Sequence, residues 1–222
     1  MAQRVAGLLS CLAVLALVVF SPQVEGQQKA PATRAASGPK AAARPPAVSY
    51  AERFAGLCAA CHGANGRAND PLTPVLAGQP SLYAITQLFL FREGRRSNPA
   101  MTAVGKTLTD DDMRGFSDYI GTLPAVPPPP PATPPDADRM AKGRALSEQY
   151  KCVFCHGADL AGGQQVPRIA GQHEEYLKES LRGFHSGGRP GYTQAMVAAV
   201  SQIPVEDLDL LAWYVARFPP GK

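Results

Sequence analysis

The chain has 222 residues, 45% of them hydrophobic, and a formal net charge of +4 at pH 7. Basic and acidic residues balance within 50–123 and within 136–222, so the positive excess lies entirely on the stretch 27–49. No sustained basic run with interleaved aromatic residues occurs, and this excludes the usual classes of nucleic-acid-binding protein.

The N-terminal 26 residues have the pattern of a secretory signal peptide. Arg4 makes the start positive, the run from Val5 to Phe20 is almost entirely apolar, and Val24-Glu25-Gly26 offers small residues for cleavage. The apolar run is 16 residues long, which is short of the ~20 residues of a membrane-spanning helix. We therefore expect 1–26 to be a signal peptide and the protein to be periplasmic, with a retained membrane anchor as the alternative.

The next stretch, 27–49, is rich in alanine and proline and shows no apolar periodicity. This composition is typical of a disordered segment. Its four basic residues are not balanced by any acidic one, so it is an Ala/Pro-rich basic arm. We expect it to serve as a tether, or as an electrostatic contact with an acidic partner or a membrane surface.

Two copies of Cys-x-x-Cys-His stand in the chain, Cys58-Ala59-Ala60-Cys61-His62 and Cys152-Val153-Phe154-Cys155-His156. The motif is the attachment signature of a c-type haem. Each cysteine pair supplies two sulfurs for thioether bonds, and the histidine is placed to reach the iron. Zinc sites and redox dithiols are the alternatives, although the first motif lacks further histidines nearby in the sequence. We expect two covalently bound haem c groups (iron), held by Cys58, Cys61, Cys152 and Cys155, with His62 and His156 as iron ligands.

The residues that follow the two motifs repeat with an offset of 93 to 95 positions, which indicates a tandem duplication of one haem-binding unit. The matched pairs include Pro74 and Pro167, Gln79 and Gln172, Tyr83 and Tyr176, Arg96 and Arg189, and Tyr119 and Tyr214. Apolar residues at helical spacing predict helices near 49–57, 81–92, 139–150 and 174–184. A capping-box pattern at Thr109 and a proline at Pro204 predict the starts of two more.

The second iron ligand follows from the same repeat. Met101 lies 39 residues after His62 and Met196 lies 40 after His156. Methionine opposite histidine is a common ligand pair in electron carriers, so we expect Met101 on the first iron and Met196 on the second. The other candidates fit less well. Met113 is predicted to be a core residue, and Met140 has no partner in the first copy. His173 and His185 are predicted to be surface or haem-edge residues.

Two recurring residue types have further expected roles. The carbonyl groups of Pro74 and Pro167 either accept a hydrogen bond from the iron-bound histidine, which would orient its ring, or the prolines only shape a loop. Some of the arginines between the glutamine and the methionine of each copy are expected to pair with haem propionates. These arginines are Arg92, Arg95, Arg96, Arg182 and Arg189.

A proline-rich segment divides the chain. The stretch 124–135 contains eight prolines in twelve residues, and such a composition favours an extended polyproline helix. We therefore expect a linker at 124–138 between a first domain at 50–123 and a second at 139–222.

Together these features resemble the dihaem class I cytochromes c of the cytochrome c4 family. The resemblance rests on Gly63 and Gly157 after the two motifs, on Ala-Gly-Gln at 77–79 and 170–172, and on the aligned methionines. It implies an all-α fold of two tandem class I cytochrome c domains, each a small helical fold wrapped around one haem. It also implies His/Met ligation in both domains and a periplasmic carrier that passes electrons towards terminal oxidases. The long proline-rich linker departs from the family and argues against its tight haem-to-haem packing.

The expected function is outer-sphere electron transfer between redox protein partners, such as a respiratory donor and a terminal oxidase, with no catalytic residue in the chain. Two alternatives stay open. One is a fixed electron-transfer subunit of a membrane dehydrogenase or oxidase complex. The other is a dihaem peroxidase-type enzyme, which would need an iron with an open or displaceable ligand.

Overall fold

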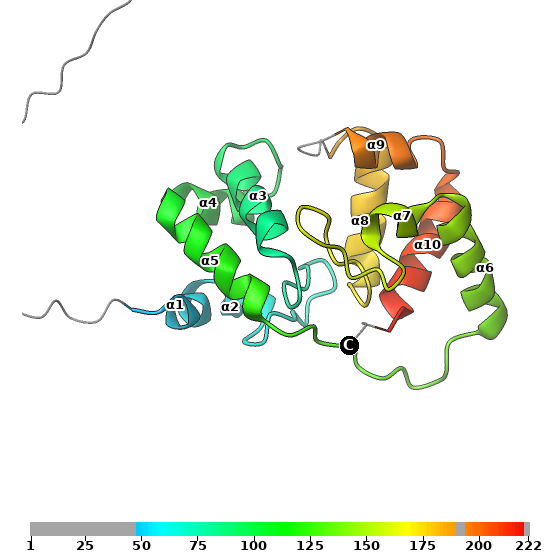
Figure 1. Ribbon diagram of the computed structural model, residues 1–222, viewed down its shortest axis with the longest axis horizontal. Helices are drawn as coiled ribbons and strands as arrows, with labels where there is room; N and C mark the ends of the chain where they lie inside the picture. The colour runs from blue at the N-terminus through cyan, green and yellow to red at the C-terminus, as the bar shows by residue number, and fades with distance from the viewer. Residues whose placement is uncertain (1–47, 190–193, 220–222) are drawn as a thin grey trace, which may run out of the picture. The chain divides into compact units, whose positions relative to one another are not determined.

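Helices make up the regular structure of the described residues, apart from one isolated β-bridge between Gly163 and Val166. The computed structural model describes residues 48–189 and 194–219 (Figure 1). The expected signal peptide at 1–26 and nearly all of the basic arm at 27–49 lie outside the described residues. The expectation of an all-α fold is confirmed.

The first five helices surround the first Cys-x-x-Cys-His motif. They are α1 (Tyr50–Leu57), α2 (Ala59–His62), α3 (Ser81–Arg92), α4 (Pro99–Thr107) and α5 (Asp110–Thr122). Helix α3 packs against α4 and α5, and α1 packs against α2 and α5. We call this group the first domain.

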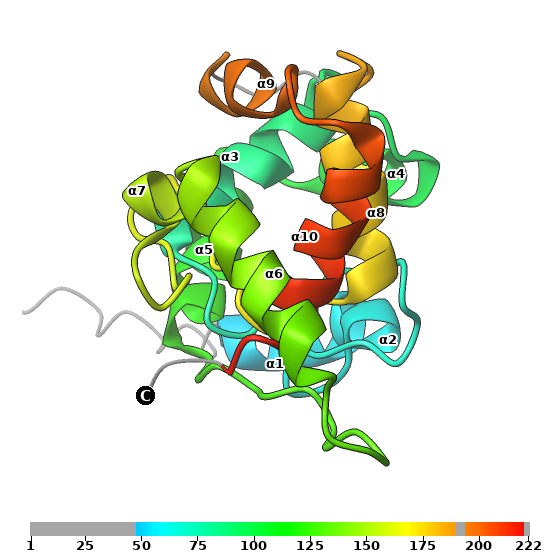
Figure 2. The ribbon, with the colours of Figure 1, turned by 90° about the vertical axis from the view of Figure 1, so that its right-hand side faces the viewer.

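The last five helices surround the second motif in the same order. They are α6 (Ala137–Gln149), α7 (Cys152–His156), α8 (Glu174–His185), α9 (Ala195–Val200) and α10 (Val205–Arg217). Helix α10 packs against α6 and α8, α9 against α8, and α7 against α6 (Figure 2). This second domain repeats the helix pairings of the first, as the duplicated sequence predicts, so the chain holds two tandem domains of one type.

Side-chain caps begin the helices where the sequence places polar residues. The Thr109 hydroxyl accepts a hydrogen bond from the Asp112 N–H at 3.1 Å, and the Asp112 carboxylate accepts one from the Thr109 N–H at 3.1 Å. This confirms the predicted capping box. Helix α6 begins at Ala137, two residues before the expected start, because the Asp136 carboxylate accepts from the Arg139 N–H. Pro204 is the cap before α10 and not part of its first turn.

Each domain has its own apolar core. In the first domain the core is built around Phe54 and Phe116, which are each 1% exposed. In the second domain Trp213 and Tyr214 of α10 are buried, and the Trp213 ring is flanked by the Arg139 and Arg217 guanidinium groups. Trp213 is therefore a packing residue.

The two domains meet through loops and through the first turn of α8. Residues 46–222 form one compact unit, yet none of the described helices of one domain packs against a helix of the other. The Tyr176 N–H donates to the Pro71 carbonyl at 3.2 Å, and the Arg67 guanidinium donates to the Gly171 carbonyl at 3.0 Å. The proline-rich linker therefore does not keep the domains apart. These hydrogen bonds join the two domains directly, while the expectation about haem-to-haem packing stays a prediction.

Among the described helices, none combines the length and the apolar character that crossing a membrane requires.

Candidate haem sites

Each Cys-x-x-Cys-His motif forms a short helix that presents two free thiols. Cys58 and Cys152 are half-buried, Cys61 and Cys155 are exposed, and none of the four is in a disulfide. A spacing of three places both sulfurs of a pair on one face of the helix. Burial raises the pKa of the Cys58 thiol to about 11 and also raises the pKa of Cys152. Two sulfurs on one face suit the two vinyl groups of one haem.

The histidine of each motif is held by a proline carbonyl. The His62 Nδ1–H donates to the Pro74 carbonyl at 3.0 Å, and the His156 Nδ1–H donates to the Pro167 carbonyl at 2.9 Å. Both rings are buried, at 6% and 7% exposure. The structure thus favours the hydrogen-bonding role of the two prolines over a loop-shaping role alone.

The same bond selects the ring nitrogen that is left for a metal. When Nδ1 donates to a carbonyl, Nε2 carries the lone pair that binds iron. Burial lowers the pKa of His62 and His156, although the proline carbonyls oppose this shift. Both imidazoles are therefore kept in the neutral form that a ligand needs. Free thiols on a helical turn, followed by an oriented neutral imidazole, fit a covalently attached haem.

A glycine after each motif is required by the backbone. Gly63 has a φ of +79° and Gly157 a φ of +83°, which side chains other than glycine rarely tolerate. A Cβ at Gly63 would lie 2.2 Å from the Arg67 carbonyl oxygen. The glycine lets the chain turn back sharply behind the histidine, towards the proline that holds it.

The two expected methionine ligands lie on helices that the sequence periodicity did not reveal. Met101 is in the first turn of α4, where its N–H donates to the Asn98 side chain at 2.9 Å. Met196 is in α9 and packs against the same apolar cluster as Cys152, centred on Leu208. The structure thus brings Met196 and its motif to one cluster. The first core cluster, as far as the described residues show, includes Cys58 but not Met101.

The remaining methionine and histidine candidates have structural contacts. Met113 is 4% exposed within the first core, so its assignment as a core residue is confirmed. His173 lies between the domains, where its Nε2–H donates to the Ala68 carbonyl at 3.0 Å. His173 is partly buried there, and its expected place at the surface or the haem edge stays a prediction. Its alignment with Pro80 in the other copy carried no signal for such a contact.

Four of the five arginines expected near the propionates bond to protein groups. Arg92 pairs with Asp110 at 2.7 Å, and Arg182 pairs with Asp209. Arg96 and Arg189 both donate to the Tyr176 hydroxyl, at 2.8 and 3.1 Å. Arg96 belongs to the first domain and Tyr176 to the second, so this cluster is also a contact between domains.

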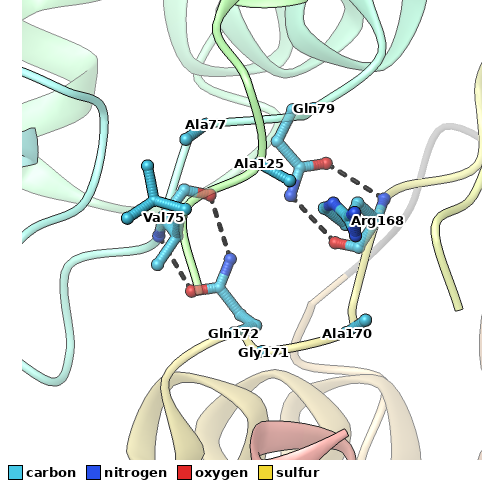
Figure 3. A pocket seen from close by; sticks show the side chains of 9 residues that line it. Val75, Ala77, Gln79, Ala125, Arg168, Ala170, Gly171 and Gln172 are labelled. Carbon is cyan, nitrogen blue, oxygen red and sulfur yellow. Dashed lines mark hydrogen bonds between the residues drawn. The ribbon is translucent and has the colours of Figure 1, made fainter. Parts of the chain in front are cut away.

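Sequence reasoning missed the part played by the two Ala-Gly-Gln triplets. The Gln79 side chain donates to the Arg168 carbonyl at 2.8 Å and accepts from the Arg168 N–H at 3.1 Å. The Gln172 side chain likewise donates to the Val75 carbonyl at 3.0 Å and accepts from the Val75 N–H at 2.8 Å (Figure 3). Both glutamines are buried. Because they occupy matched positions of the repeat, the duplication was the available signal.

The glutamine pairs enclose a small cavity at the domain boundary. Its volume is about 10 Å³, close to the least that one water molecule occupies. Gly78 approaches the other domain so closely that a Cβ there would lie 2.9 Å from the Arg168 Nε. The glycine of the triplet thus allows the contact and the glutamine makes it.

Comparison with known proteins agrees with this reading of fold and site. Residues 51–124 and 140–216 both match the family model described as Cytochrome c. Each match covers one Cys-x-x-Cys-His motif and the helices around it, so the chain is a protein with two covalently bound haem c groups.

Similarity to individual proteins extends over most of the chain. A cytochrome c4 of Thiocapsa roseopersicina is 30% identical over 171 residues, which are 72% of this chain and 86% of that protein. The crystal structure of reduced recombinant cytochrome c4 from Pseudomonas stutzeri superposes with a TM-score of 0.67 at 25% identity, over 76% of this chain and 96% of that one. A thiosulfate dehydrogenase electron acceptor of Thiomonas intermedia (strain K12) is 31% identical, over 73% of this chain and 71% of that protein. The chain belongs to the cytochrome c family and, within it, to the dihaem cytochrome c4 group, so it is an electron carrier.

Proposed function

We propose that each domain holds its haem through the two cysteines of its motif and ligates the iron with one histidine and one methionine. The residues are Cys58, Cys61, His62 and Met101 in the first domain, and Cys152, Cys155, His156 and Met196 in the second. The observation that carries this proposal is the hydrogen bond from each buried histidine to a proline carbonyl, which leaves one ring nitrogen for iron. The matched spacing of the two methionines supports the remaining ligand.

In this arrangement the chain transfers electrons and does not transform a substrate. Haem iron supplies the chemistry by gaining or losing one electron. The histidine fixes one side of the iron, and a methionine sulfur on the other side raises the potential relative to a second histidine. Because both sides are then taken by protein ligands, a substrate would find no position on the iron, and we assign no catalytic residue.

The proposed partners are redox proteins that dock briefly and exchange single electrons through small interfaces. The N-terminal sequence supports a periplasmic location, where a respiratory donor and a terminal oxidase, or a similar acceptor, would be the exchange partners. The balance of charge in each domain favours docking without strong electrostatic attraction.

One observation favours a second candidate function. The relative from Thiomonas intermedia is described as a thiosulfate dehydrogenase electron acceptor. A fixed electron-transfer subunit of a membrane dehydrogenase or oxidase complex would have the same two haems. Fractionation of cells distinguishes the two candidates, because a free carrier is recovered in the soluble periplasmic fraction and a fixed subunit co-purifies with an enzyme at the membrane.

The test of the carrier proposal is an optical redox titration of the purified holoprotein, repeated under carbon monoxide. We expect two reversible one-electron steps at high potential that carbon monoxide leaves unchanged, because His/Met ligation occupies both sides of each iron. Binding of carbon monoxide to the native ferrous protein at either haem would overturn the proposal. That result would favour a peroxidase-type enzyme with an open iron.

A further inference from the structure

We propose that each domain tunes the haem ligand of the other domain through a hydrogen-bonded glutamine. Gln172 of the second domain would act on His62, and Gln79 of the first domain would act on His156. Both glutamines are positioning residues, since they act on the iron ligand through one peptide group. The inference rests on the proposed roles of His62 and His156 as iron ligands.

The geometry that carries the proposal is a continuous chain of hydrogen bonds. The Gln172 Oε1 accepts from the Val75 N–H at 2.8 Å. The Val75 N–H and the Pro74 carbonyl belong to the same peptide group, which is planar and conjugated. The Pro74 carbonyl in turn accepts from the His62 Nδ1–H at 3.0 Å. One peptide group therefore lies between the glutamine of one domain and the histidine of the other.

The other copy of the repeat contains the same series of hydrogen bonds, which runs from a glutamine of the first domain to the histidine of the second. The Gln79 Oε1 accepts from the Arg168 N–H at 3.1 Å, and the Pro167 carbonyl of that peptide accepts from the His156 Nδ1–H at 2.9 Å. Two independent copies of one arrangement, made by residues 89 and 97 positions apart in sequence, make a chance contact a poor explanation.

A second bond on each glutamine holds the amide in the orientation that the chain needs. The Gln172 Nε2–H donates to the Val75 carbonyl at 3.0 Å, and the Gln79 Nε2–H donates to the Arg168 carbonyl at 2.8 Å. Because the nitrogen of each amide donates to a backbone carbonyl, its oxygen faces the backbone N–H of Val75 or Arg168. Both side chains are buried, at 5% and 6% exposure, so water does not compete freely for these bonds.

The expected electronic effect has a definite sign. Hydrogen bonds in a chain polarise one another, so a glutamine that accepts from Val75 makes the Pro74 carbonyl a better acceptor. A better acceptor raises the basicity of the iron-bound imidazole. A more basic imidazole favours ferric iron, which lowers the potential of that haem. Removing the glutamine should therefore raise the potential of the haem in the opposite domain.

The test compares Gln172→Leu and Gln79→Leu in the full-length holoprotein, with the reduction of each haem followed separately by NMR. We expect Gln172→Leu to raise the midpoint of the first haem and Gln79→Leu to raise that of the second. The expected change in each reduction equilibrium is severalfold, where tenfold corresponds to about 59 mV for one electron. A second readout is the Nδ1–H resonance in the ferrous protein, which should move for His62 in one variant and for His156 in the other.

His173→Leu is the matched control. It removes a hydrogen bond between the domains, to the Ala68 carbonyl, at the position next to Gln172 but outside the peptide groups of the two prolines. We expect it to leave both midpoints in place. If a leucine variant fails to retain two haems, Gln172→Asn or Gln79→Asn is measured instead, because a side chain one carbon shorter loses the same contact with less loss of packing.

The outcomes separate this inference from the proposed function. Shifts of the haem in the same domain as the mutated glutamine, equal shifts of both haems, or no shift would overturn cross-domain tuning. A failure of the proposed function would be seen in the unmutated protein, as carbon monoxide binding or the lack of two high-potential steps. Two closed haems without the crossed pattern would thus reject the inference and keep the carrier.

Discussion

The two domains of the molecule share a fold, but they differ in which helix carries the glycine where their first and last helices cross. In the first domain, a Cβ on Gly115 of α5 would overlap the ring of Tyr50 on α1, at 2.0 Å from its nearest atom. In the second domain, a Cβ on Gly143 of α6 would lie 2.4 Å from the Cβ of Tyr214 on α10. The glycine and the aromatic residue have exchanged helices. A close helix crossing is therefore the shared feature, and the residue that makes room for it is free to change sides.

The hydrogen-bonded sites of the motif histidines differ from these helix crossings, because both domains use the same residues there. The histidine, the proline carbonyl and the glutamine occupy matched positions in both copies, with similar hydrogen-bond lengths. A helix crossing needs only space, which many residue pairs provide. The proposed role of the histidine as an iron ligand needs one atom in one orientation, which explains why the same residues recur.

The largest expected effect tests whether the two domains ligate iron alike. Met101→Ala and Met196→Ala should each open one iron, so that carbon monoxide binds the ferrous haem of that domain. The potential of that haem should also change by on the order of 100 mV, since axial ligands spread haem potentials over about 0.8 V. Redox titration and carbon monoxide difference spectra measure both effects.

Met113→Leu is the control for the methionine variants, because Met113 is a core residue. It should cost less than about 1.5 kcal/mol of stability and leave both potentials in place. A Met101→Ala protein that still excludes carbon monoxide would show that another residue ligates the first iron, and the two domains would then differ in ligation.

A smaller effect should distinguish the two helix crossings. Gly143→Ala places a methyl group against the Cβ of Tyr214, which cannot move without α10, so we expect a loss of about 1–3 kcal/mol from overpacking. Gly115→Ala places it against the far end of the half-buried Tyr50 ring, so the ring must turn and give up the hydrogen bond of its hydroxyl to the Asp111 carbonyl, a loss of about 1 kcal/mol. The gain in helix propensity, about 1 kcal/mol, should then make Gly115→Ala nearly neutral.

Denaturant unfolding of the holoprotein, followed by circular dichroism for both domains, measures this difference. Trp213 is the only tryptophan in the sequence and lies in the second domain, so its fluorescence reports the unfolding of that domain. Equal losses in the two variants would show that both crossings are equally rigid.

The smallest expected effect is a difference in titration between two matched tyrosines. Burial raises the pKa of Tyr176, but the positive charges of Arg96 and Arg189 outweigh it and lower that pKa to about 7. Burial raises the pKa of Tyr83, and the charge of Tyr176 raises it further. We expect ¹³C NMR of ring-labelled protein to show one interdomain tyrosine titrating near neutral pH, and this signal to be lost in Tyr176→Phe.

The sign of the linked change in stability follows from the pKa shifts. A lowered native pKa means that the unfolded chain holds the Tyr176 proton to higher pH, so this group adds stability as the pH rises from about 7 towards 10 and removes it as the pH falls again. The raised pKa of Tyr83 acts in the opposite sense at more alkaline pH. Titration of both tyrosines together near pH 10 would contradict the expected difference.

The sequence by itself determined the features that depend on neighbouring residues. Two Cys-x-x-Cys-His motifs predicted the haem sites and apolar periodicity predicted the longer helices, because each of these patterns lies within a few turns of chain. The offset of 93 to 95 residues predicted the duplication, because the same local pattern occurs twice. The recurrence of Pro74 and Pro167 made their carbonyls candidates for holding the histidines, and the hydrogen bonds of the structure favoured this role over loop shaping alone. Helices α4 and α9 were missed, since they are short and their apolar residues show no clear period.

Only the tertiary structure decided how the two copies meet. The exchange of Gln79 and Gln172 joins segments separated by about ninety residues, and the contact of His173 with Ala68 joins segments even further apart. No local pattern encodes such contacts, because a buried amide bonds whichever backbone the fold brings to it. For the same reason the proline-rich linker, which reads as a spacer, did not set the distance between the domains. That distance was set by hydrogen bonds between residues of the two domains that lie outside the linker.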